Sequence, residues 1–408
     1  MSSTAAPSSS SPAAPAVDRD SQTVTLPDGR TLGFAEYGAP DGSPVIYLHG
    51  FPSNRLEGQA FDKAAKQHRV RLLSLDRPGM GLSTLQPGRT MLDWPDDVLA
   101  FAETQSISKF GVLGASGGGP YVLACARKLP PTALTHVGIM CGAGDFSAAS
   151  RKAGVIPRRS RWADFLARHW PWAFQMFLGS IVGLARWIVR TKTVTRRIDA
   201  WLATMDQKEA ERKAEERAAK KKELEVAGAE SGARASDTRS EGSVDDSFEE
   251  VNGVAGSVES LSTVATTRPG SSKAVEAAAF TEDVVNEDED DGTPKQTIPQ
   301  RREAMLRAVF ETFAQGCRAT LEDARVLASD LGIKYEEITF DPVMVWHGDE
   351  DVNTPLPWIK LITDRIPHAS LKVYPGKSHY TLAEDIDEII AHFSPDSGLK
   401  KDTPSTEQ

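Results

Sequence analysis

The segment that most constrains the fold of this 408-residue chain is Leu113-Gly114-Ala115-Ser116-Gly117-Gly118. It lies between residues 110–113, an apolar run typical of a β-strand, and residues 120–128, a run with helical character. Where a strand turns sharply into a helix, the positions two before and two after the central residue must be small, because larger side chains would collide with the neighbouring strand or helix. The segment therefore predicts a strained turn that presents Ser116 as a candidate nucleophile.

Along most of the chain, short apolar runs alternate with segments of helix length. The runs are residues 45–48, 72–75, 110–113, 137–140, 343–346 and 371–374. Ahead of them, residues 22–37 alternate apolar and polar side chains around a Pro-Asp-Gly turn, which is typical of a hairpin at a sheet edge. This order predicts an α/β fold with a doubly wound, mostly parallel sheet that is buried on both faces.

The alternation of strands and helices stops after the predicted strand 137–140, which is the sixth when the two strands of the hairpin are counted. Residues 146–206 hold five of the eight tryptophans together with interleaved arginines, and they predict the first part of a helical cap. Residues 301–336 return to helical periodicity and predict its second part. Between them, residues 207–300 are a polyampholyte followed by an acidic stretch, with too few apolar side chains to order itself, although its first part can form a solvated helix.

The remaining segments form one α/β domain, which the cap and the polar insertion interrupt. Residues 21–145 and 337–395 predict the two parts of the α/β core. The polar tails 1–20 and 396–408 are expected to be disordered, and the first of them lacks the apolar stretch of a secretory signal.

Composition narrows the functional classes. The formal net charge of −10 and the lack of a groove-reading motif argue against nucleic-acid binding. The three cysteines, Cys125, Cys141 and Cys317, are odd in number and lack the spacing of a metal site, so neither a disulfide framework nor a zinc site is expected. We therefore predict a reducing, cytoplasmic location.

A serine hydroxyl is a weak nucleophile unless a base takes its proton and a third group holds that base. Asp351 follows the predicted strand 343–346, and His379 follows the predicted strand 371–374. Because the carboxyl ends of parallel strands meet at one edge of a sheet, Ser116, Asp351 and His379 are predicted to converge there. The other acids that the spacing leaves open are Asp349, Glu350 and Asp145.

A further element of the same chemistry is a pair of backbone donors for an oxyanion. His49-Gly50-Phe51-Pro52 follows the predicted strand 45–48, and the N–H groups of Phe51 and Gly117 are the candidate donors. His49 and His347 are expected to order their loops by hydrogen bonding. Asp76 begins the segment Asp-Arg-Pro-Gly, and its carboxylate is expected to keep that turn rigid through a salt link.

Five sequence blocks occur in order and at suitable spacing. They are HGFPSNR at 49–55, DRPGMGLS at 76–83, GASGGGPYVLACA at 114–126, HGDEDVNTP at 347–355 and GKSH at 376–379. On these blocks, residues 22–145 and 335–394 resemble the α/β-hydrolase superfamily, in which the order Ser, Asp, His is typical. The resemblance implies the α/β-hydrolase fold and an acyl-transfer hydrolase, but no particular substrate.

The leading functional hypothesis is a serine hydrolase that needs neither metal nor cofactor and acts on a hydrophobic small-molecule carboxylic ester. One alternative is a peptidase or amidase resembling proline iminopeptidases. Another is a non-catalytic hydrolase-fold protein that binds a ligand, with the acidic insertion docking a partner that the sequence does not identify.

The apolar run 170–185 has two interpretations. It is short for a membrane span and is interrupted by Pro171 and Gln175. The preferred interpretation is a cap helix that packs over the pocket and gives it an apolar roof. The alternative is an interfacial helix that contacts anionic lipid through the flanking arginines.

Overall fold

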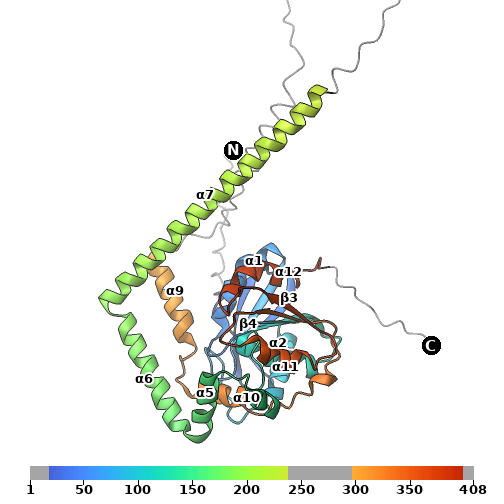
Figure 1. The fold of residues 1–408 in the computed structure, drawn as a ribbon. Coiled ribbons are helices and arrows are strands. Elements are labelled where there is room, and N and C mark those ends of the chain that lie inside the picture. The colour runs from blue at the N-terminus through green and yellow to red at the C-terminus, as the bar shows by residue number, and fades with distance from the viewer. Residues whose placement is uncertain (1–17, 238–295, 398–408) are drawn as a thin grey trace, which may run out of the picture. The chain divides into compact units, whose positions relative to one another are not determined.

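The computed structural model describes residues 18–237 and 296–397 (Figure 1). The described residues form an eight-stranded sheet in the order β1-β2-β4-β3-β5-β6-β7-β8. The first two strands form the predicted antiparallel hairpin, β2 pairs antiparallel with β4, and every pair from β4 to β8 is parallel. The predicted fold class is therefore confirmed. The strands are β1 Gln22–Thr25, β2 Thr31–Gly38, β3 Ser43–Leu48, β4 Val70–Leu75, β5 Phe110–Ala115, β6 Leu134–Met140, β7 Val343–Gly348 and β8 Ala369–Tyr374.

The sheet is buried on both faces because its central strands carry apolar side chains at consecutive positions. In β3, Ile46 and Leu48 join one hydrophobic cluster, whereas Val45 and Tyr47 join the other. Helices α2 (Trp94–Thr104), α3 (Gly119–Lys128) and α11 (Leu356–Thr363) contribute to the first cluster, and α1 (Asp62–Gln67) and α12 (Ile386–Ala391) to the second. The short 3-10 helices are η1 Arg55–Phe61, η2 Met91–Asp93, η3 Ser116–Gly118, η4 Tyr335–Glu337 and η5 Thr381–Asp385.

The helical cap enters after β6, as predicted. Its helices are α4 Ala148–Ala153, α5 Arg158–His169, α6 Pro171–Val189, α9 Ile298–Glu311 and α10 Arg318–Ala328. The second part of the cap is two helices, separated near Gly316, whose φ of 91° is one that residues with a side chain rarely adopt. A small apolar cluster joins Ala167 of α5 to Leu321 and Ala324 of α10.

The described residues of the segment 192–302, which are 192–237 and 296–302, belong to a unit separate from the core. Its helix α7, Lys192–Asp237, continues through the predicted boundary at 206/207, so the first part of the polyampholyte segment is helical. Within this unit, Asp199 pairs with Arg302 at 2.6 Å and Asp206 pairs with Arg301. Residues 238–295 of the predicted insertion lie outside the described residues, as do most residues of both predicted tails.

Helix α10 is attached to the core by a buried ionic cluster. Asp323 accepts hydrogen bonds from Arg77 Nη2 at 2.8 Å, Arg89 Nη2 at 2.5 Å and the Tyr121 hydroxyl at 2.5 Å. The side chains of Arg77 and Asp323 are completely buried. Burial by itself raises the pKa of Asp323, but the two guanidinium groups outweigh it and hold this pKa well below its usual range.

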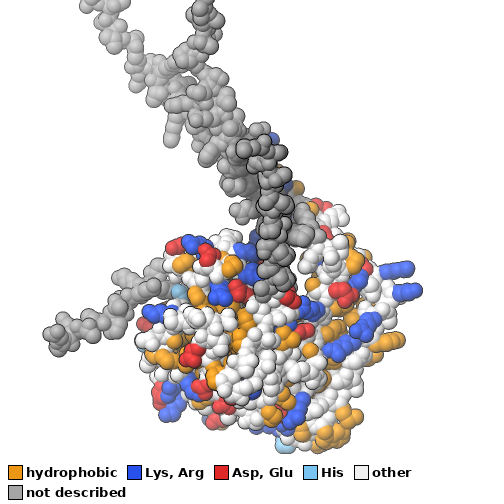
Figure 2. Space-filling model, turned by 180° about the vertical axis from the view of Figure 1, so that it is seen from behind, with side chains coloured by type: hydrophobic (Ala, Val, Ile, Leu, Met, Phe, Trp, Pro, Cys, Tyr) orange, Lys and Arg blue, Asp and Glu red, His pale blue; other side chains and the backbone are white. Residues whose placement is uncertain are grey.

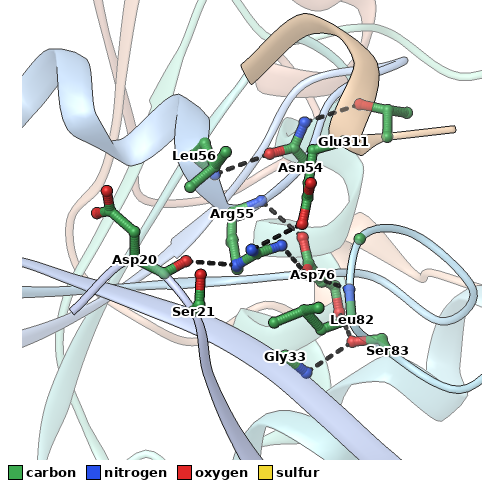
Figure 3. Close-up of polar contacts among 12 residues, drawn as sticks. Asp20, Ser21, Gly33, Asn54, Arg55, Leu56, Asp76, Leu82, Ser83 and Glu311 are labelled. Carbon is green, nitrogen blue, oxygen red and sulfur yellow. Dashed lines mark hydrogen bonds and ion pairs between the residues drawn. The ribbon is translucent and has the colours of Figure 1, made fainter. Parts of the chain in front are cut away.

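A second attachment joins α9 to the core, and Figure 3 shows Arg55 at its centre. The Arg55 guanidinium lies 2.9 Å from Asp76 Oδ2 and 2.8 Å from Glu311 Oε1 at the end of α9. Asp76 also accepts the backbone N–H groups of Arg55 and Leu82. The expectation that Asp76 holds a rigid turn through a salt link is therefore confirmed.

We predict that Asp323→Asn lowers the free energy of unfolding by about 3–5 kcal/mol, because it leaves two buried guanidinium groups without their carboxylate. The depressed pKa of Asp323 fixes the sign of the pH dependence. The contribution of ionised Asp323 to the free energy of unfolding is complete above the pKa of an unfolded aspartate, which is about 4. It is lost only as the pH falls through the lower pKa of the folded state. The loss should therefore be the same throughout about pH 5–8 in urea unfolding.

The control for this variant is Asp330→Asn, which changes an exposed carboxylate two residues after α10. We expect it to alter the free energy of unfolding by less than about 0.5 kcal/mol. Equal effects of the two substitutions would contradict the assigned role of Asp323.

We also predict that replacing residues 210–296 by a short Gly/Ser linker leaves the core folded. The ion pairs of Asp199 with Arg302 and of Asp206 with Arg301 bring the two flanks of the deletion together. Loop length contributes little to stability. The melting temperature should shift by less than about 4 °C, the change that about 1 kcal/mol produces in a domain of this size. A collapse of the transition in differential scanning calorimetry would contradict this prediction.

Candidate active site

The predicted strained turn lies at the carboxyl end of β5. Strand β5 ends at Ala115, and Ser116 begins η3, which leads directly into α3. Ser116 has a φ of 53°, in the left-handed region that side-chain-bearing residues rarely adopt. A Cβ on Gly118 would lie 2.0 Å from the Leu48 carbonyl oxygen, and a Cβ on Gly114 would lie 2.7 Å from a Val122 methyl group. Only glycine fits at these two positions, which confirms the steric argument from the sequence.

Two loops bring an acid and a base together at the same sheet edge. His379, which follows β8, donates from Nδ1 to Asp351 Oδ2, which follows β7, over 2.7 Å. Thr354 supports the carboxylate with its hydroxyl, at 2.8 Å from Oδ2, and with its N–H, at 2.8 Å from Oδ1. Burial tends to raise the pKa of Asp351, but its hydrogen bonds with His379 and Thr354 prevail and lower it. An ionised Asp351 keeps the proton of His379 on Nδ1 and leaves Nε2 free as an acceptor.

The alternative acids have other partners. Asp349 accepts the N–H of Gly376 at 2.7 Å, and Asp145 accepts hydrogen bonds from Ser147 and Ser150. Among the acids that the sequence left open, the hydrogen bonds of the described chain join His379 to Asp351 alone.

Ser116 and His379 line one cavity of about 440 Å³. The large side chains around it are mainly apolar and include Phe51, Phe146, Leu327 and Trp358. In the described chain no hydrogen bond joins Ser116 directly to His379; such contacts are often long before a substrate binds.

The cap contributes to this cavity through α5 and α10. Ala163 of α5 and Ala324 of α10 are among the lining residues. The prediction that residues 170–185 form the pocket roof is wrong, because in the described structure the lining residues of the cap come from α5 and α10 rather than α6. Helix periodicity identified the apolar residues of α6 but not which neighbour each of its faces would contact.

The candidate oxyanion donors lie next to Ser116. A Cβ on Gly117 would lie 2.6 Å from Phe51 Cβ and 3.1 Å from Phe51 N, so the two backbone segments are in direct contact. Gly117 belongs to the first turn of η3, where backbone N–H groups have no acceptor within the helix. Phe51 and Gly117 both line the cavity that Ser116 lines.

Arg77 fixes the conformation of the loop that carries Phe51. It donates from Nη2 to the Gly50 carbonyl over 2.9 Å and from Nη1 to the His49 carbonyl. His49 is buried, accepts the Arg77 N–H at Nε2 over 3.3 Å and contacts the Gly50 carbonyl at 2.8 Å through Nδ1. Burial, together with the nearby Arg77 charge, lowers the pKa of His49 well below its usual value, so His49 is a neutral loop-ordering residue.

His347 has a comparable role at the acid loop. Its Nε2 donates to the Thr354 carbonyl over 2.7 Å, and burial lowers its pKa. Thr354 itself was missed by the sequence analysis. The signal for a turn was Asp351, because an aspartate side chain accepts the backbone N–H groups of residues that follow it, here Asn353 and Thr354. The Arg77–Asp323 contact had no local signal, because the two residues are 246 positions apart.

One group of possible metal donors occurs in the described residues. Cys141, Asp351 and His379 bring one donor atom each within 4.8 Å of one another. Burial raises the pKa of the Cys141 thiol to about 12, and His379 Nδ1 is already engaged with Asp351. A protonated thiol is a poor metal ligand, and so is an imidazole nitrogen that already makes a hydrogen bond. We therefore interpret the three residues as a hydrogen-bonded cluster rather than a metal site.

Comparison with known proteins bears on the fold. No model of a known protein family matches the chain. An α/β hydrolase enzyme from a Medee basin deep-sea metagenome library is 12% identical, with 94% of this chain and 100% of that chain covered and a TM-score of 0.50.

Curated relatives match a shorter region. The dihydrolipoyllysine-residue acetyltransferase component of the acetoin cleaving system of Pseudomonas putida is 32% identical over 117 residues, 28% of this chain and 31% of the relative. A non-heme chloroperoxidase of Streptomyces lividans is 31% identical over 111 residues, 27% and 40% of the two chains. A proline iminopeptidase of Xanthomonas citri is 29% identical over 126 residues, 29% and 38% of the two chains.

The chain thus spans between about a third and two fifths of the length of these relatives. The fold rests on the sheet order, the strained turn at Ser116 and the structural match, and the five sequence blocks agree with it. Together these findings show that the chain has the α/β-hydrolase fold.

Proposed function

We propose that this protein is a serine hydrolase in which Ser116 is the nucleophile, His379 the base and Asp351 the acid that orients the base. The observation that carries the proposal is the 2.7 Å hydrogen bond from His379 Nδ1 to Asp351, made at the wall of the cavity that Ser116 also lines. The positive φ of Ser116 supports it, because backbone strain at a cavity wall is typical of functional residues.

The proposed reaction has two stages. Ser116 Oγ attacks the carbonyl carbon of the ester while His379 Nε2 takes the hydroxyl proton, and the oxyanion of the tetrahedral intermediate faces the N–H groups of Phe51 and Gly117. His379 then gives the proton to the leaving alcohol, which leaves an acyl group on Ser116. Water then attacks the acyl carbon while His379 takes its proton. His379 returns that proton to Ser116 Oγ as the acyl–oxygen bond breaks, which releases the acid and free Ser116.

The lining of the cavity favours a hydrophobic carboxylic ester. Phe51, Phe146 and Trp358 offer apolar surface to an acyl or alcohol group. A peptidase that recognises a free amino terminus needs a carboxylate available for the ammonium group. Asp164 is a carboxylate in the described lining, but it is already paired with Arg151 at 3.1 Å and with Arg168. We therefore place the peptidase or amidase activity second, although two curated relatives are proline iminopeptidases.

The proposed location is cytoplasmic, in line with the free state of Cys125, Cys141 and Cys317. The partner of the acidic insertion stays unassigned, because residues 238–295 lie outside the described chain.

We predict that Ser116→Ala abolishes labelling by a fluorophosphonate probe and lowers kcat on p-nitrophenyl esters by a factor on the order of 10⁴ or more, because no other activated hydroxyl replaces it. The control is Ser108→Ala, an exposed serine before β5, which should label and turn over like the wild type. Full esterase activity in Ser116→Ala would refute the proposed nucleophile. Ligand binding by a wild type that neither labels nor turns over would instead support the non-catalytic alternative.

The volume of the cavity leads to a prediction about substrate size. Ala163→Phe adds a ring to the wall formed by α5 and should lower kcat/KM for long-chain p-nitrophenyl esters by about tenfold or more, with the acetate changed much less. The control Ala153→Phe places the same ring on an exposed position of α4 and should leave the chain-length profile unchanged. Faster hydrolysis of prolyl-p-nitroanilide than of every ester tested would favour the peptidase alternative.

A further inference from the structure

Helix α6 presents an uncovered apolar face. In the described chain, ten of the sixteen large hydrophobic side chains that are exposed belong to α5, α6 or the residue between them, and their exposed fractions run from 38% to 66%. We call this surface the α5–α6 face; it consists of Trp162, Phe165, Trp170, Trp172, Met176, Phe177, Ile181, Leu184, Trp187 and Ile188. Figure 2 shows exposed hydrophobic side chains beside Lys and Arg side chains on this side of the molecule. A contiguous apolar surface of this kind marks an interaction site.

The opposite side of α6 is packed against the cap. Phe174 joins the apolar cluster of α5 and α10, and Val182 is only 8% exposed. Arg186 Nη2 donates to the carbonyl oxygens of Phe310 and Phe313, at 3.2 Å each, and its guanidinium lies over the Phe310 ring. Helix α6 thus contacts the cap at Phe174 and again, twelve residues later, at Arg186.

These contacts with the cap bear on whether α6 spans a membrane or lies in the membrane plane. By length and composition, α6 is apolar enough to cross a membrane. A helix that crosses a bilayer needs lipid or other spanning segments around it. Because one side of α6 is held along the cap, it fits a helix that lies in the membrane plane with only its exposed face in the lipid.

The positive charge around the α5–α6 face favours an anionic surface as its partner. Between Arg158 and Arg190 the chain has six arginines and one acidic residue, Asp164, whereas the whole chain has a net charge of −10. Arg158, Arg161 and Arg190 are exposed at the ends of α5 and α6. Tryptophan beside arginine is typical of segments that sit at the headgroup level of an anionic bilayer. A second copy of the chain would bring the same cationic rim against itself, which disfavours self-association through this face.

We propose that the α5–α6 face docks in the plane of an anionic lipid surface. Ser160 and Ala163 of α5 line the cavity that holds Ser116, whereas Trp162 and Phe165 of the same helix belong to the docking face. Docking would therefore bring one wall of the cavity next to the lipid, and its relevance to a hydrophobic ester rests on the proposed function.

The test is flotation of the full chain with vesicles of phosphatidylcholine, with and without phosphatidylserine. The wild type should float with the phosphatidylserine-containing vesicles and detach at high ionic strength, since the cationic rim contributes to binding. The triple variant Trp172→Ser/Phe177→Ser/Trp187→Ser should bind at least about tenfold more weakly, because three large apolar side chains no longer enter the lipid. Its melting temperature should match the wild type, since all three side chains are exposed.

Matched variants separate this surface from general changes in hydrophobicity and charge. Val309→Ser/Val373→Ser removes exposed apolar side chains from α9 and β8 and should float like the wild type. Arg158→Glu/Arg161→Glu should weaken flotation, whereas Lys63→Glu/Lys109→Glu, an equal change of charge on exposed positions of the core, should not.

Three outcomes would overturn the proposal. They are no flotation of the wild type, equal flotation of the triple variant, and a dimer in analytical ultracentrifugation that the triple variant abolishes without any vesicle binding. Resistance of bound protein to alkaline carbonate extraction would contradict in-plane docking and favour a span. Ser116→Ala should float normally, so failure of the docking proposal and failure of the serine-hydrolase proposal are distinguishable.

Discussion

The buried pair of Arg77 and Asp323 holds the candidate oxyanion loop and helix α10 together. The guanidinium of Arg77 holds the carbonyl groups of His49 and Gly50 on one side and the carboxylate of Asp323 on the other. Neither side chain can be buried alone without a large desolvation cost, so the shape of the candidate oxyanion loop and the docking of helix α10 are fixed together. The cap is in this way coupled to the site that it covers.

The candidate active site gathers at one sheet edge because β5, β7 and β8 are parallel and end at the same level. A turn or loop follows each of these strands and carries one of the three side chains. Ser116 follows β5, Asp351 follows β7 and His379 follows β8. The rigid sheet keeps Ser116 in its strained conformation, and Thr354 keeps the carboxylate of Asp351 oriented. Orientation before substrate binding is what lets such groups act without a reorganisation cost.

The adjacent cap helices α5 and α6 differ in what they contact: α5 lines the cavity, and both helices contribute to the exposed apolar face. Helix α5 has one side on the cavity and the other on the exposed apolar face that continues along α6. The sequence favoured α6 as a cap helix over the pocket. In the structure α6 does pack on the cap with one side, but its other side is apolar and uncovered, which a period of 3.6 residues in an apolar run cannot distinguish from a buried face.

Local sequence patterns were sufficient to predict the sheet, the hairpin, the point where the cap enters and the turn at Ser116, because these depend on the order of apolar residues and on glycines that no larger residue can replace. It also named Asp351 and His379, since both follow predicted strands. Three features became clear from the folded chain alone: which acid contacts His379, which helices line the cavity and which face of α6 is exposed. Those outcomes depend on contacts such as Arg77 with Asp323, formed across 246 residues and set by burial and charge, and no local pattern encodes them.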